Sequence, residues 1–504
     1  MNDIIVVGAG TAGMCCAIRA AELGAKVLVI EKDSLVGGTL HVTAGHMSGG
    51  GTKRQAEKGI EDSPTLHFED VMKISKHTAD PAIVKLATDL APKTIDWLQD
   101  LGFPFEPDTP KFIYGHVPYK IPRTHWGTTA YEGTEIKWAG STIFETIKPV
   151  WDKLIEEGKI EIHLNTTLEN ILLENGEVKG IVCKELSGTN EQTTKQTNHQ
   201  TIKHLNNQTT QQFNSKTVIL TTGGYASNHD FFKEVTPDWP KLVSTARHTS
   251  TGDGILAAMN IGAKFHNAEK HTATLGGLEL EPGSGRTDFW KHWCRVSNAV
   301  DRKPREIYIN AESKRFMDEN ESDVDLREKT VEAQTGKKFW VIFDEKALNE
   351  TEGGGIIPQF TPEKLKAEAA TEKAVWTANS IEELAQKIGL DENILSNTVG
   401  IFNNSVQTQN DEEFGRTHLK NEVSEAPFYA ILTHCFSLVS FGGLATTPDL
   451  QVIDENNKPI AGLYAAGEIL GGGVTCGNAF VGGMFITPAM SFGRYLGEKL
   501  AKLS

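Results

Sequence analysis

The sequence predicts an α/β fold with a Rossmann-like, mostly parallel sheet. The first support is a strand, glycine turn, helix and second strand within residues 3–31, the βαβ unit that opens a doubly wound sheet. The second is the return of glycine-rich strand-to-helix turns in residues 427–504. From about residue 265 the pattern changes, because charged helical stretches alternate with apolar runs. We therefore expect an α+β cap domain inserted between two pieces of the first domain.

The opening turn has the glycine spacing of a dinucleotide-binding site. Gly8 permits the tight turn, Gly10 lets a pyrophosphate approach the backbone, and Gly13 lets helix and strand pack closely. The N-terminus of the following helix offers free N–H groups and a partial positive charge to the phosphates. Glu31 ends the second strand, where its carboxylate can accept hydrogen bonds from both ribose hydroxyls. Together these features predict a dinucleotide site.

Further stretches suit the rest of a long cofactor. Residues 37–51, rich in glycine and hydroxyl groups, follow the ribose-binding strand and can lie flat along a ligand. Residues 471–483 lead into the last helix, whose N-terminus can stabilise negative charge on a reduced ring. Asp253 precedes another helix, so it either caps that helix or holds a cofactor hydroxyl.

Bulk properties exclude several classes of function. A chain of 504 residues predicts two or three domains. Its net charge of -16 argues against nucleic acid or an anionic membrane as a partner. No apolar stretch is long enough to cross a bilayer, and the first strand follows the initiator methionine so closely that we expect no signal peptide. The expected location is therefore the cytoplasm.

Two other features are expected to have no chemical role. The six cysteines form no CxxC pair and no metal-ligand cluster, so buried reduced thiols are favoured and no metal is expected. Residues 187–216 are dominated by Asn, Gln and Thr and cannot bury enough apolar surface to form a core. We interpret them as a surface excursion that interrupts a hairpin.

Short motifs spread over nearly the whole chain resemble those of one family, in the same order. They are residues 7–13, Glu31-Lys32 with Gly37-Gly38, 221–224, 251–254, 310–319, 462–468 and 491–494. The chain thus resembles the FAD-dependent flavoproteins of the fumarate reductase and succinate dehydrogenase family, whose soluble branch includes 3-ketosteroid dehydrogenases and urocanate reductases. The resemblance implies an FAD-binding domain formed by residues 1–268 and 427–504, with a cap or substrate domain at 269–426.

The resemblance also implies which residues contact FAD. These are Gly8, Gly10, Thr11, Ala12, Gly13, Glu31, Lys32, Gly38, Thr39, Ala44, Gly45, His46, Leu168, Thr222, Gly223, Asp253, Glu468 and Ile486. Membrane-bound relatives attach FAD through a histidine, and here pairing on residues 45–47 puts Thr39 at that position, although His41 lies close. We therefore expect noncovalent FAD.

The substrate pocket departs from the family pattern. Phe480 stands where the dicarboxylate reductases carry an arginine, and Val439 lies in a segment where they carry a histidine. Gly483 retains the glycine whose N–H lies near the substrate carbonyl in the ketosteroid enzymes. A carboxylate is held best by a bidentate arginine. We therefore expect a larger or less charged substrate than fumarate or succinate, such as an enone, a saturated ketone or a monocarboxylate.

The expected reaction is hydride exchange between flavin N5 and a carbon β to a carbonyl. Arg327 is the first candidate for the proton-transfer group, from the resemblance alone, and a cap-domain ion pair is its alternative. Rival candidates are His271, Tyr119, Tyr114 and Tyr131. The run 289–293, with two tryptophans, could form the wall of an apolar pocket.

Two other functions are compatible with the sequence. The protein could run the reaction in reverse, desaturating a cyclic ketone as the ketosteroid enzymes do. It could instead be a flavoprotein without turnover that acts as a redox-dependent binding module. The chain has no haem-attachment CxxCH and no iron–sulfur cysteine set, so we expect electrons to pass to or from an unknown soluble carrier or the substrate itself.

Overall fold

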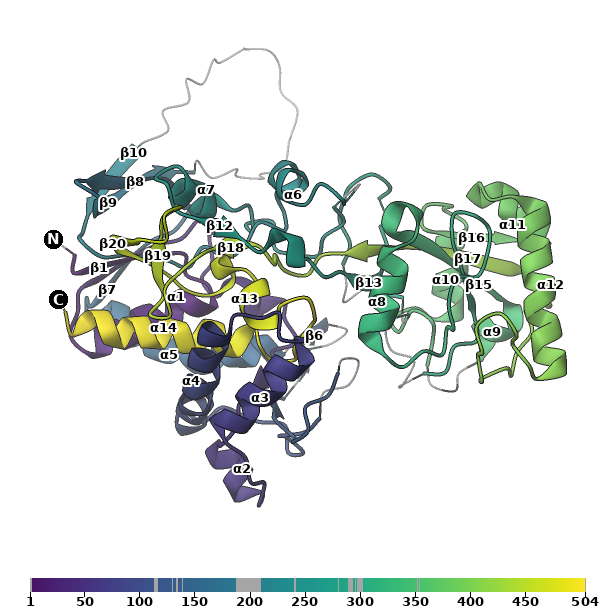
Figure 1. The fold of residues 1–504 in the computed structure, drawn as a ribbon, viewed down its shortest axis with the longest axis horizontal. Coiled ribbons are helices and arrows are strands. Elements are labelled where there is room, and N and C mark those ends of the chain that lie inside the picture. Colours follow the sequence, from purple (N-terminus) through teal and green to yellow (C-terminus); the bar gives the residue numbers. More distant parts are fainter. Residues whose placement is uncertain are drawn as a thin grey trace, which may run out of the picture.

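The structure, a computed structural model, consists of two bodies lying side by side along the long axis of the molecule (Figure 1). It describes residues 2–112, 117–128, 130–132, 135–137, 139–186, 210–239, 242–279, 281–288, 293–294, 296, 302–350, 352 and 354–503, with the backbone alone for 130–132 and 135–137. One body contains both ends of the chain. The other is made from the middle of the sequence.

The first body is built on a nine-stranded sheet. Its main path runs β10-β9-β20-β11-β1-β2-β7, with β19 added to β20 and β8 to β9. The strands are β1 (Ile4–Val7), β2 (Val27–Ile30), β7 (Ile160–His163), β8 (Thr166–Glu174), β9 (Glu177–Glu185), β10 (Thr210–Asn214), β11 (Val218–Leu220), β19 (Gln451–Ile453) and β20 (Pro459–Ala465). The central pairs β20-β11-β1-β2-β7 are all parallel. The predicted α/β class is therefore confirmed.

Strand β20 comes from the C-terminal piece of the sequence, yet it lies between β9 and β11. The last helix, α14 (Ile486–Ala501), packs along α1 (Thr11–Glu22) of the N-terminal piece. A Cβ on Gly493 would lie 2.2 Å from the carbonyl oxygen of Ala12, so only glycine allows this close approach. One sheet and one helix pair thus join the two distant pieces, as the predicted inserted-cap arrangement requires.

Other elements of the first body surround this centre. They are η1 (Gly38–His41), β3 (Met47–Ser48), α2 (Lys53–Glu57), α3 (Pro64–Ile74), α4 (Pro81–Asp100), β4 (Thr124–His125), β5 (Ala130–Glu132), β6 (Glu135–Lys137), α5 (Ala139–Glu156), α6 (His229–Val235), α7 (Asp253–Met259), β12 (Phe265–His266), η2 (Ala268–Lys270), β18 (Gly443–Leu444), η4 (Glu468–Leu470) and α13 (Gly473–Cys476). Figure 1 shows α1, α5 and α14 together below the sheet, with α7 on the opposite side.

The cap is an antiparallel sheet covered by helices. Its order is β13-β17-β15-β14, with β16 also paired to β17. The elements are β13 (Thr274–Gly277), β14 (Ile307–Ile309), α8 (Val324–Glu332), η3 (Thr335–Lys337), β15 (Lys338–Asp344), α9 (Glu345–Asn349), α10 (Pro362–Ala369), β16 (Val375–Ala378), α11 (Ile381–Ile388), α12 (Glu392–Thr408) and β17 (Phe428–Phe436). Buried apolar residues from α11, α12 and the sheet form a separate core there.

The cap boundary expected at residue 426 needs correction. It would assign β17 to the FAD-binding body, whereas β17 pairs with β13, β15 and β16 of the cap sheet. The apolar run of β17 is typical of a buried strand in either body, so its sequence does not reveal its partner. We propose that the cap ends after Phe436.

The family motif at residues 310–319 serves to hold the cap together. Arg315 and Glu319 form an ion pair with an N–O distance of 2.8 Å, and both side chains are buried. Asp411 and Arg416 complete the network, at 3.0 and 3.2 Å from these partners. Every charge in the network thus has an opposite charge beside it, as burial requires.

The low-complexity excursion is partly described by the structure. Residues 187–209 lie outside the described residues. Residues 210–214, which we expected to belong to the excursion, instead form β10, which pairs antiparallel with β9 from Thr210–Lys184 to Asn214–Gly180. The pairing is that of a hairpin whose two strands flank the excursion. Alternate side chains of β10 are exposed, which explains why its sequence is so polar.

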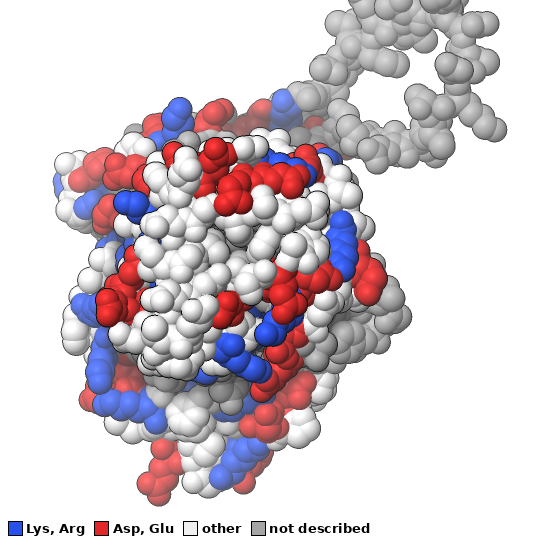
Figure 2. All heavy atoms as spheres, turned by 90° about the vertical axis from the view of Figure 1, so that its right-hand side faces the viewer, with Lys and Arg blue, Asp and Glu red and all other residues white. Residues whose placement is uncertain are grey.

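The outer end of the cap is shown in Figure 2. Side chains of both signs of charge border a central uncharged area. Helix α12, which lies at this end in Figure 1, contains Glu392 as its one charged residue. Within the described parts of the chain, no helix is long and apolar enough to span a bilayer.

Candidate active site

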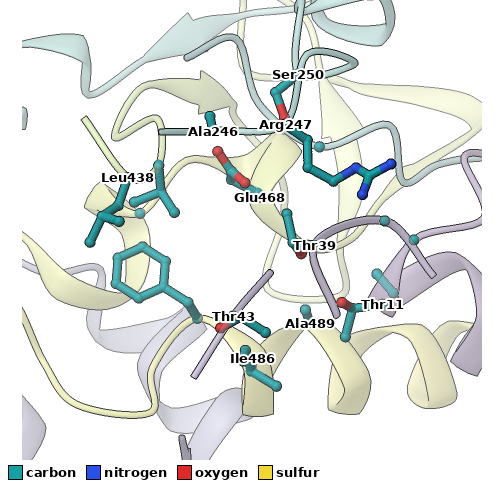
Figure 3. Close-up of a pocket in the computed structure, with 18 of the residues that line it drawn as sticks. Thr11, Thr39, Thr43, Ala246, Arg247, Ser250, Leu438, Glu468, Ile486 and Ala489 are labelled. Carbon is teal, nitrogen blue, oxygen red and sulfur yellow. The ribbon is translucent and has the colours of Figure 1, made fainter. Parts of the chain in front are cut away.

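A cavity of about 780 Å³ lies where the parallel strands of the first body end, and it extends to the cap. Its wall includes the turn after β1, the end of β2, the loop after β11, the segment before α14 and cap residues. Figure 3 shows Thr11, Thr39, Ile486 and Ala489 on one side of this space and Glu468, Ala246 and Leu438 on the other. Crevices at the carboxyl ends of parallel strands are the usual ligand sites of open α/β sheets.

The phosphate-binding turn has the predicted geometry. Gly8 has φ +102°, and a Cβ there would lie 2.5 Å from the carbonyl oxygen of Thr221. Gly10 is the N-cap of α1, and no side chain caps the helix. The first turn of α1 contains no acidic residue. Its N–H groups and the positive end of the helix dipole can therefore act on a phosphate at the cavity wall.

The ribose end gathers a small network of charged side chains. The Glu31 carboxylate accepts from the N–H groups of Ala9 (2.6 Å) and Asp33 (2.7 Å), while burial raises the pKa of Glu31. Lys32 forms an ion pair with Asp253 at 2.5 Å, and Thr167 donates to the same carboxylate at 3.3 Å. Asp253 lies in the first turn of α7 and lines the cavity, but no described side chain caps this helix, so the capping role considered for Asp253 is not observed.

The glycine-rich segment after β2 forms part of the floor. Thr39 lines the cavity, whereas His41 turns away and donates from Nε2 to the carbonyl oxygen of Val36 at 2.8 Å. His46 also lines the cavity, with its ring 4.7 Å from that of Trp126. Burial lowers the pKa of His46 to about 4, so its imidazole is neutral at pH 7.

The opposite wall is supplied by the C-terminal piece. Glu468 is buried and accepts from the N–H (2.9 Å) and hydroxyl (3.2 Å) of Ser440. Burial raises the pKa of Glu468. Ile486 and Ala489 from the first turn of α14 face the same space (Figure 3). Thr222 Oγ1 is buried without a hydrogen-bond partner among the described residues, so a polar ligand group is needed beside it.

The cavity brings together all but two of the residues predicted to contact the cofactor. The lining ones are Gly8, Gly10, Thr11, Ala12, Glu31, Lys32, Gly38, Thr39, Ala44, His46, Leu168, Thr222, Gly223, Asp253, Glu468 and Ile486. Gly13 and Gly45 do not line it. A Cβ on Gly13 would lie 1.8 Å from the carbonyl oxygen of Gly8, and one on Gly45 would lie 2.5 Å from the Gly140 nitrogen. Their role is therefore close backbone packing.

The three residues predicted for the substrate pocket also line this cavity, namely Phe480, Gly483 and Val439. Gly483 has φ +76°, and a Cβ there would lie 2.5 Å from the Ser48 nitrogen, so this turn requires glycine. The ring of Phe480 lies 5.3 Å from that of Phe485, and both face the cavity. This part of the wall is therefore largely apolar.

Arg327, the first candidate for proton transfer, does not line the cavity. It is 1% exposed, and its guanidinium donates to the backbone carbonyl oxygens of Glu319 (2.9 Å), Glu321 (3.0 Å) and Val296. These bonds direct it into the cap interior. The prediction is corrected: Arg327 ties segments of the cap together through these carbonyls, and it forms no ion pair with any residue that the structure describes.

His271 and Tyr119 are also buried away from the cavity. The His271 ring packs edge-on against Trp239 at 4.6 Å and Phe232 at 5.1 Å, and neither ring nitrogen has a partner among the described residues. Tyr119 donates to the Gly482 carbonyl oxygen at 2.6 Å. It therefore positions the turn before Gly483 rather than touching a ligand. Tyr114 and the side chain of Tyr131 lie outside the described residues.

Several lining residues carried no recognisable sequence signal. Arg247 reaches the wall and pairs with Asp33 at 2.5 Å (Figure 3). From the cap come Thr274, Trp293, Pro358, Gln359 and Glu328. Trp293 belongs to the aromatic run suspected of forming a pocket wall, whereas the others stand in no motif. Only the contact between the two bodies brings them to the cavity.

This fold and this cavity define a class, namely proteins that hold a flavin dinucleotide across a Rossmann-like sheet. The chain belongs to the FAD binding domain family, whose family model matches residues 3–484. This confirms FAD as the cofactor and an FAD-dependent oxidoreductase as the type of enzyme. The glycine turn, the acidic ribose end and the unpartnered Thr222 hydroxyl fit such a ligand.

Similar proteins support the predicted branch of the family. The chain is 29% identical to a fumarate reductase (cytochrome) of Shewanella frigidimarina over 513 residues, covering 100% of this chain and 77% of the relative. It is 26% identical to the vinyl phenol reductase of Lactiplantibacillus plantarum, covering 92% and 89%. The fold matches 3-ketosteroid Δ1-dehydrogenase of Sterolibacterium denitrificans with a TM-score of 0.75 at 22% identity, covering 100% of both chains.

Proposed function

We propose that this protein reduces a carbon–carbon double bond conjugated to an electron-withdrawing group. When bound and reduced by an external two-electron donor, FAD would supply the hydride that adds to the β-carbon. The observation that carries the proposal is that one continuous cavity runs from the phosphate-binding turn at Gly8 to an apolar end at Phe480 and Val439. Reductases that act on fumarate and vinyl phenol are among the relatives.

We further propose that the substrate carries less charge than fumarate. Among the described lining residues the two permanent cations are Lys32 and Arg247, and each is paired with a carboxylate near the ribose end. His46 is neutral at pH 7 because of its burial. A dicarboxylate would therefore lose water without gaining a bidentate partner. An enone, a ketone or a monocarboxylate suits the apolar end better.

The remaining features of the proposal concern how FAD is held and supplied with electrons. We propose that FAD is bound noncovalently, because Thr39 faces the cavity while His41 is turned away on Val36. Electrons would come from an unidentified soluble donor. The six cysteines are all unpaired and buried, which supports a reducing compartment such as the cytoplasm.

The test is reoxidation of the photoreduced holoprotein under anaerobic conditions. The probes are 2-cyclohexen-1-one, 4-vinylphenol, acrylate, urocanate and fumarate. We expect recovery of flavin absorbance, with a neutral conjugated probe faster than fumarate. Fastest reoxidation by fumarate would contradict the charge argument, and no reoxidation by any probe would overturn the reductase proposal. Bleaching of the oxidised protein by cyclohexanone would favour desaturation, a second candidate supported by the apolar wall around Phe480.

A substitution sharpens the charge argument. Phe480→Arg should place a cation at the apolar end and raise the rate with fumarate relative to 2-cyclohexen-1-one by about tenfold or more, because a charge-assisted hydrogen bond is worth about 1.5–3 kcal/mol. Phe480→Leu is the control, since it shortens the side chain without adding charge. An unchanged preference in Phe480→Arg would show that this position does not select the substrate.

A further inference from the structure

Helix α8 contributes one ionisable side chain, that of Glu328, to the cavity wall. Figure 1 shows α8 at the side of the cap that faces the first body. Glu328 lines the cavity, is 3% exposed, and its Oε2 has no hydrogen-bond partner among the described residues. A buried polar atom without a partner is costly and indicates a group that binds there.

The neighbours of Glu328 on α8 show how unusual this is. Asp325, one turn earlier, pairs with Lys76 at 3.0 Å. Glu332, one turn later, accepts from the Ala273 N–H at 2.9 Å and pairs with Lys329 at 3.0 Å. Each of these carboxylates therefore has a partner within the protein. The Glu328 side chain lies at the cavity wall instead.

The surroundings of Glu328 favour the protonated form of its carboxyl group. Burial, followed by the like charges of Asp325 and Glu332, raises its pKa well above the ordinary range, and the opposing effects of Lys329 and Arg327 are smaller. Cys435 of β17 also lies near it, and burial raises the pKa of that thiol as well. The other described cap residues on the cavity wall are Thr274, Trp293, Pro358 and Gln359, none of which is ionisable. A neutral acid at the end of an apolar cavity can release a proton to a bound molecule.

We propose that Glu328 is the group that gives a proton to the substrate carbon adjacent to the electron-withdrawing group. This inference rests on the proposed reduction of a conjugated double bond. As the hydride adds to the β-carbon, the O–H bond of Glu328 breaks and a C–H bond forms at the α-carbon. Glu328 is left as a carboxylate and takes its next proton from solvent water, while an external two-electron donor restores the reduced cofactor.

Helix geometry explains why Arg327, the residue expected from the resemblance, does not reach the cavity while Glu328 does. Successive residues of an α-helix point about 100° apart, so a shift of one position exchanges cavity for interior. Arg327 points into the cap, where three backbone carbonyls hold it. Glu328 then occupies the position facing the cavity. The chemistry expected at 327 is thereby assigned to 328, with a carboxylic acid in place of a guanidinium.

The test compares Glu328→Gln with Glu332→Gln in the FAD-loaded protein. Both changes replace a carboxyl on the same helix by an amide of equal size. We expect Glu328→Gln to keep its FAD absorbance and to slow reoxidation of the photoreduced protein by 2-cyclohexen-1-one, or by the first panel probe that the wild type reduces, about 100-fold or more, the usual contribution of a general acid. Glu328→Asp should recover part of the rate. Glu332→Gln should stay within about threefold, because Glu332 does not line the cavity and because burial, the largest cause of the raised Glu328 pKa, is unchanged.

A second readout does not depend on turnover. Infrared spectra of the oxidised wild-type protein at pH 7 should contain a carbonyl band of a protonated carboxylic acid that is lost in Glu328→Gln and kept in Glu332→Gln. Absence of that band, or a Glu328→Gln rate within threefold of the wild type, would overturn the assignment while leaving the reductase proposal standing. If the wild type itself reduces no probe, the reductase proposal fails, and the assignment of Glu328 fails with it.

Discussion

The two ends of the cavity are built in different ways. At the cofactor end the wall includes backbone turns that require glycine, as at Gly8, where a Cβ would lie 2.5 Å from the Thr221 carbonyl oxygen. At the cap end the wall consists of side chains, such as Glu328, Trp293 and Phe480, that arrive from separate elements. Backbone turns leave a pattern in the sequence because they restrict residue type. Convergent side chains restrict residue type less, so Glu328 was not predicted, although Phe480 and the aromatic run that contains Trp293 were.

The largest expected effect tests the backbone end. Gly13→Val would put a side chain where even a Cβ lies 1.8 Å from the Gly8 carbonyl oxygen and 2.7 Å from Thr221 Oγ1. We expect a loss of more than about 3 kcal/mol in the free energy of unfolding and little bound FAD, measured by thermal unfolding and flavin absorbance. The control is Gly400→Ala in α12, where a Cβ meets nothing within 4 Å, and it should gain up to about 1 kcal/mol. A Gly13→Val protein with normal FAD content would show that the cofactor end does not require glycine at this position, contrary to the contrast drawn between the two ends of the cavity.

The next effect concerns pH and a histidine at the cap side. Burial lowers the pKa of His271 to about 3, so the folded protein holds it neutral while the unfolded chain takes up a proton below about pH 6.5. Folding stability therefore falls as the pH drops from about 6.5 towards 3, with up to about 1.4 kcal/mol per pH unit from this residue. His271→Phe should show a shallower decline in denaturant unfolding between pH 6.5 and 4.5. Equal slopes would show that the site admits water or relaxes on protonation.

A smaller effect tests the ribose end. Glu31→Gln leaves one oxygen for two N–H donors, those of Ala9 and Asp33. An unmade buried hydrogen bond costs about 1–3 kcal/mol, so we expect FAD affinity to fall about 10- to 100-fold in titrations of the apoprotein. Glu22→Gln, at an exposed position on α1, should bind FAD as the wild type does. Equal affinity of Glu31→Gln and the wild type would rule out a role for this carboxylate in binding.

The smallest effect concerns the turn that leads to Gly483. Tyr119→Phe removes the bond to the Gly482 carbonyl oxygen, which should lower the free energy of unfolding by about 1–3 kcal/mol without changing FAD content. Tyr495→Phe removes an exposed bond to Asp449 and should cost less. If Tyr119→Phe instead abolished turnover at unchanged stability, Tyr119 would have the catalytic role first considered for it.

The sequence predicted the fold and the cofactor end of the cavity to a large extent. Gly8, Gly10 and Glu31 each perform a task that a particular residue type does best, so spacing alone located them. Strand β17 was assigned to the wrong body because an apolar run does not record which strand it will pair with. Arg327 and Glu328 differ by one position on α8, and the rotation of that helix is set by packing that no local pattern encodes.

The position of β20 has a consequence for the order of events during synthesis. Until residues 459–465 have left the ribosome, β9 and β11 lack the strand that lies between them in the finished sheet. The helix that borders the cavity, α14, follows later still. A nascent chain can therefore pair the strands of its cap sheet, β13 to β17, before it can hold FAD. We therefore expect FAD to bind only after β20, the last strand of the sheet to be synthesised, has taken its place.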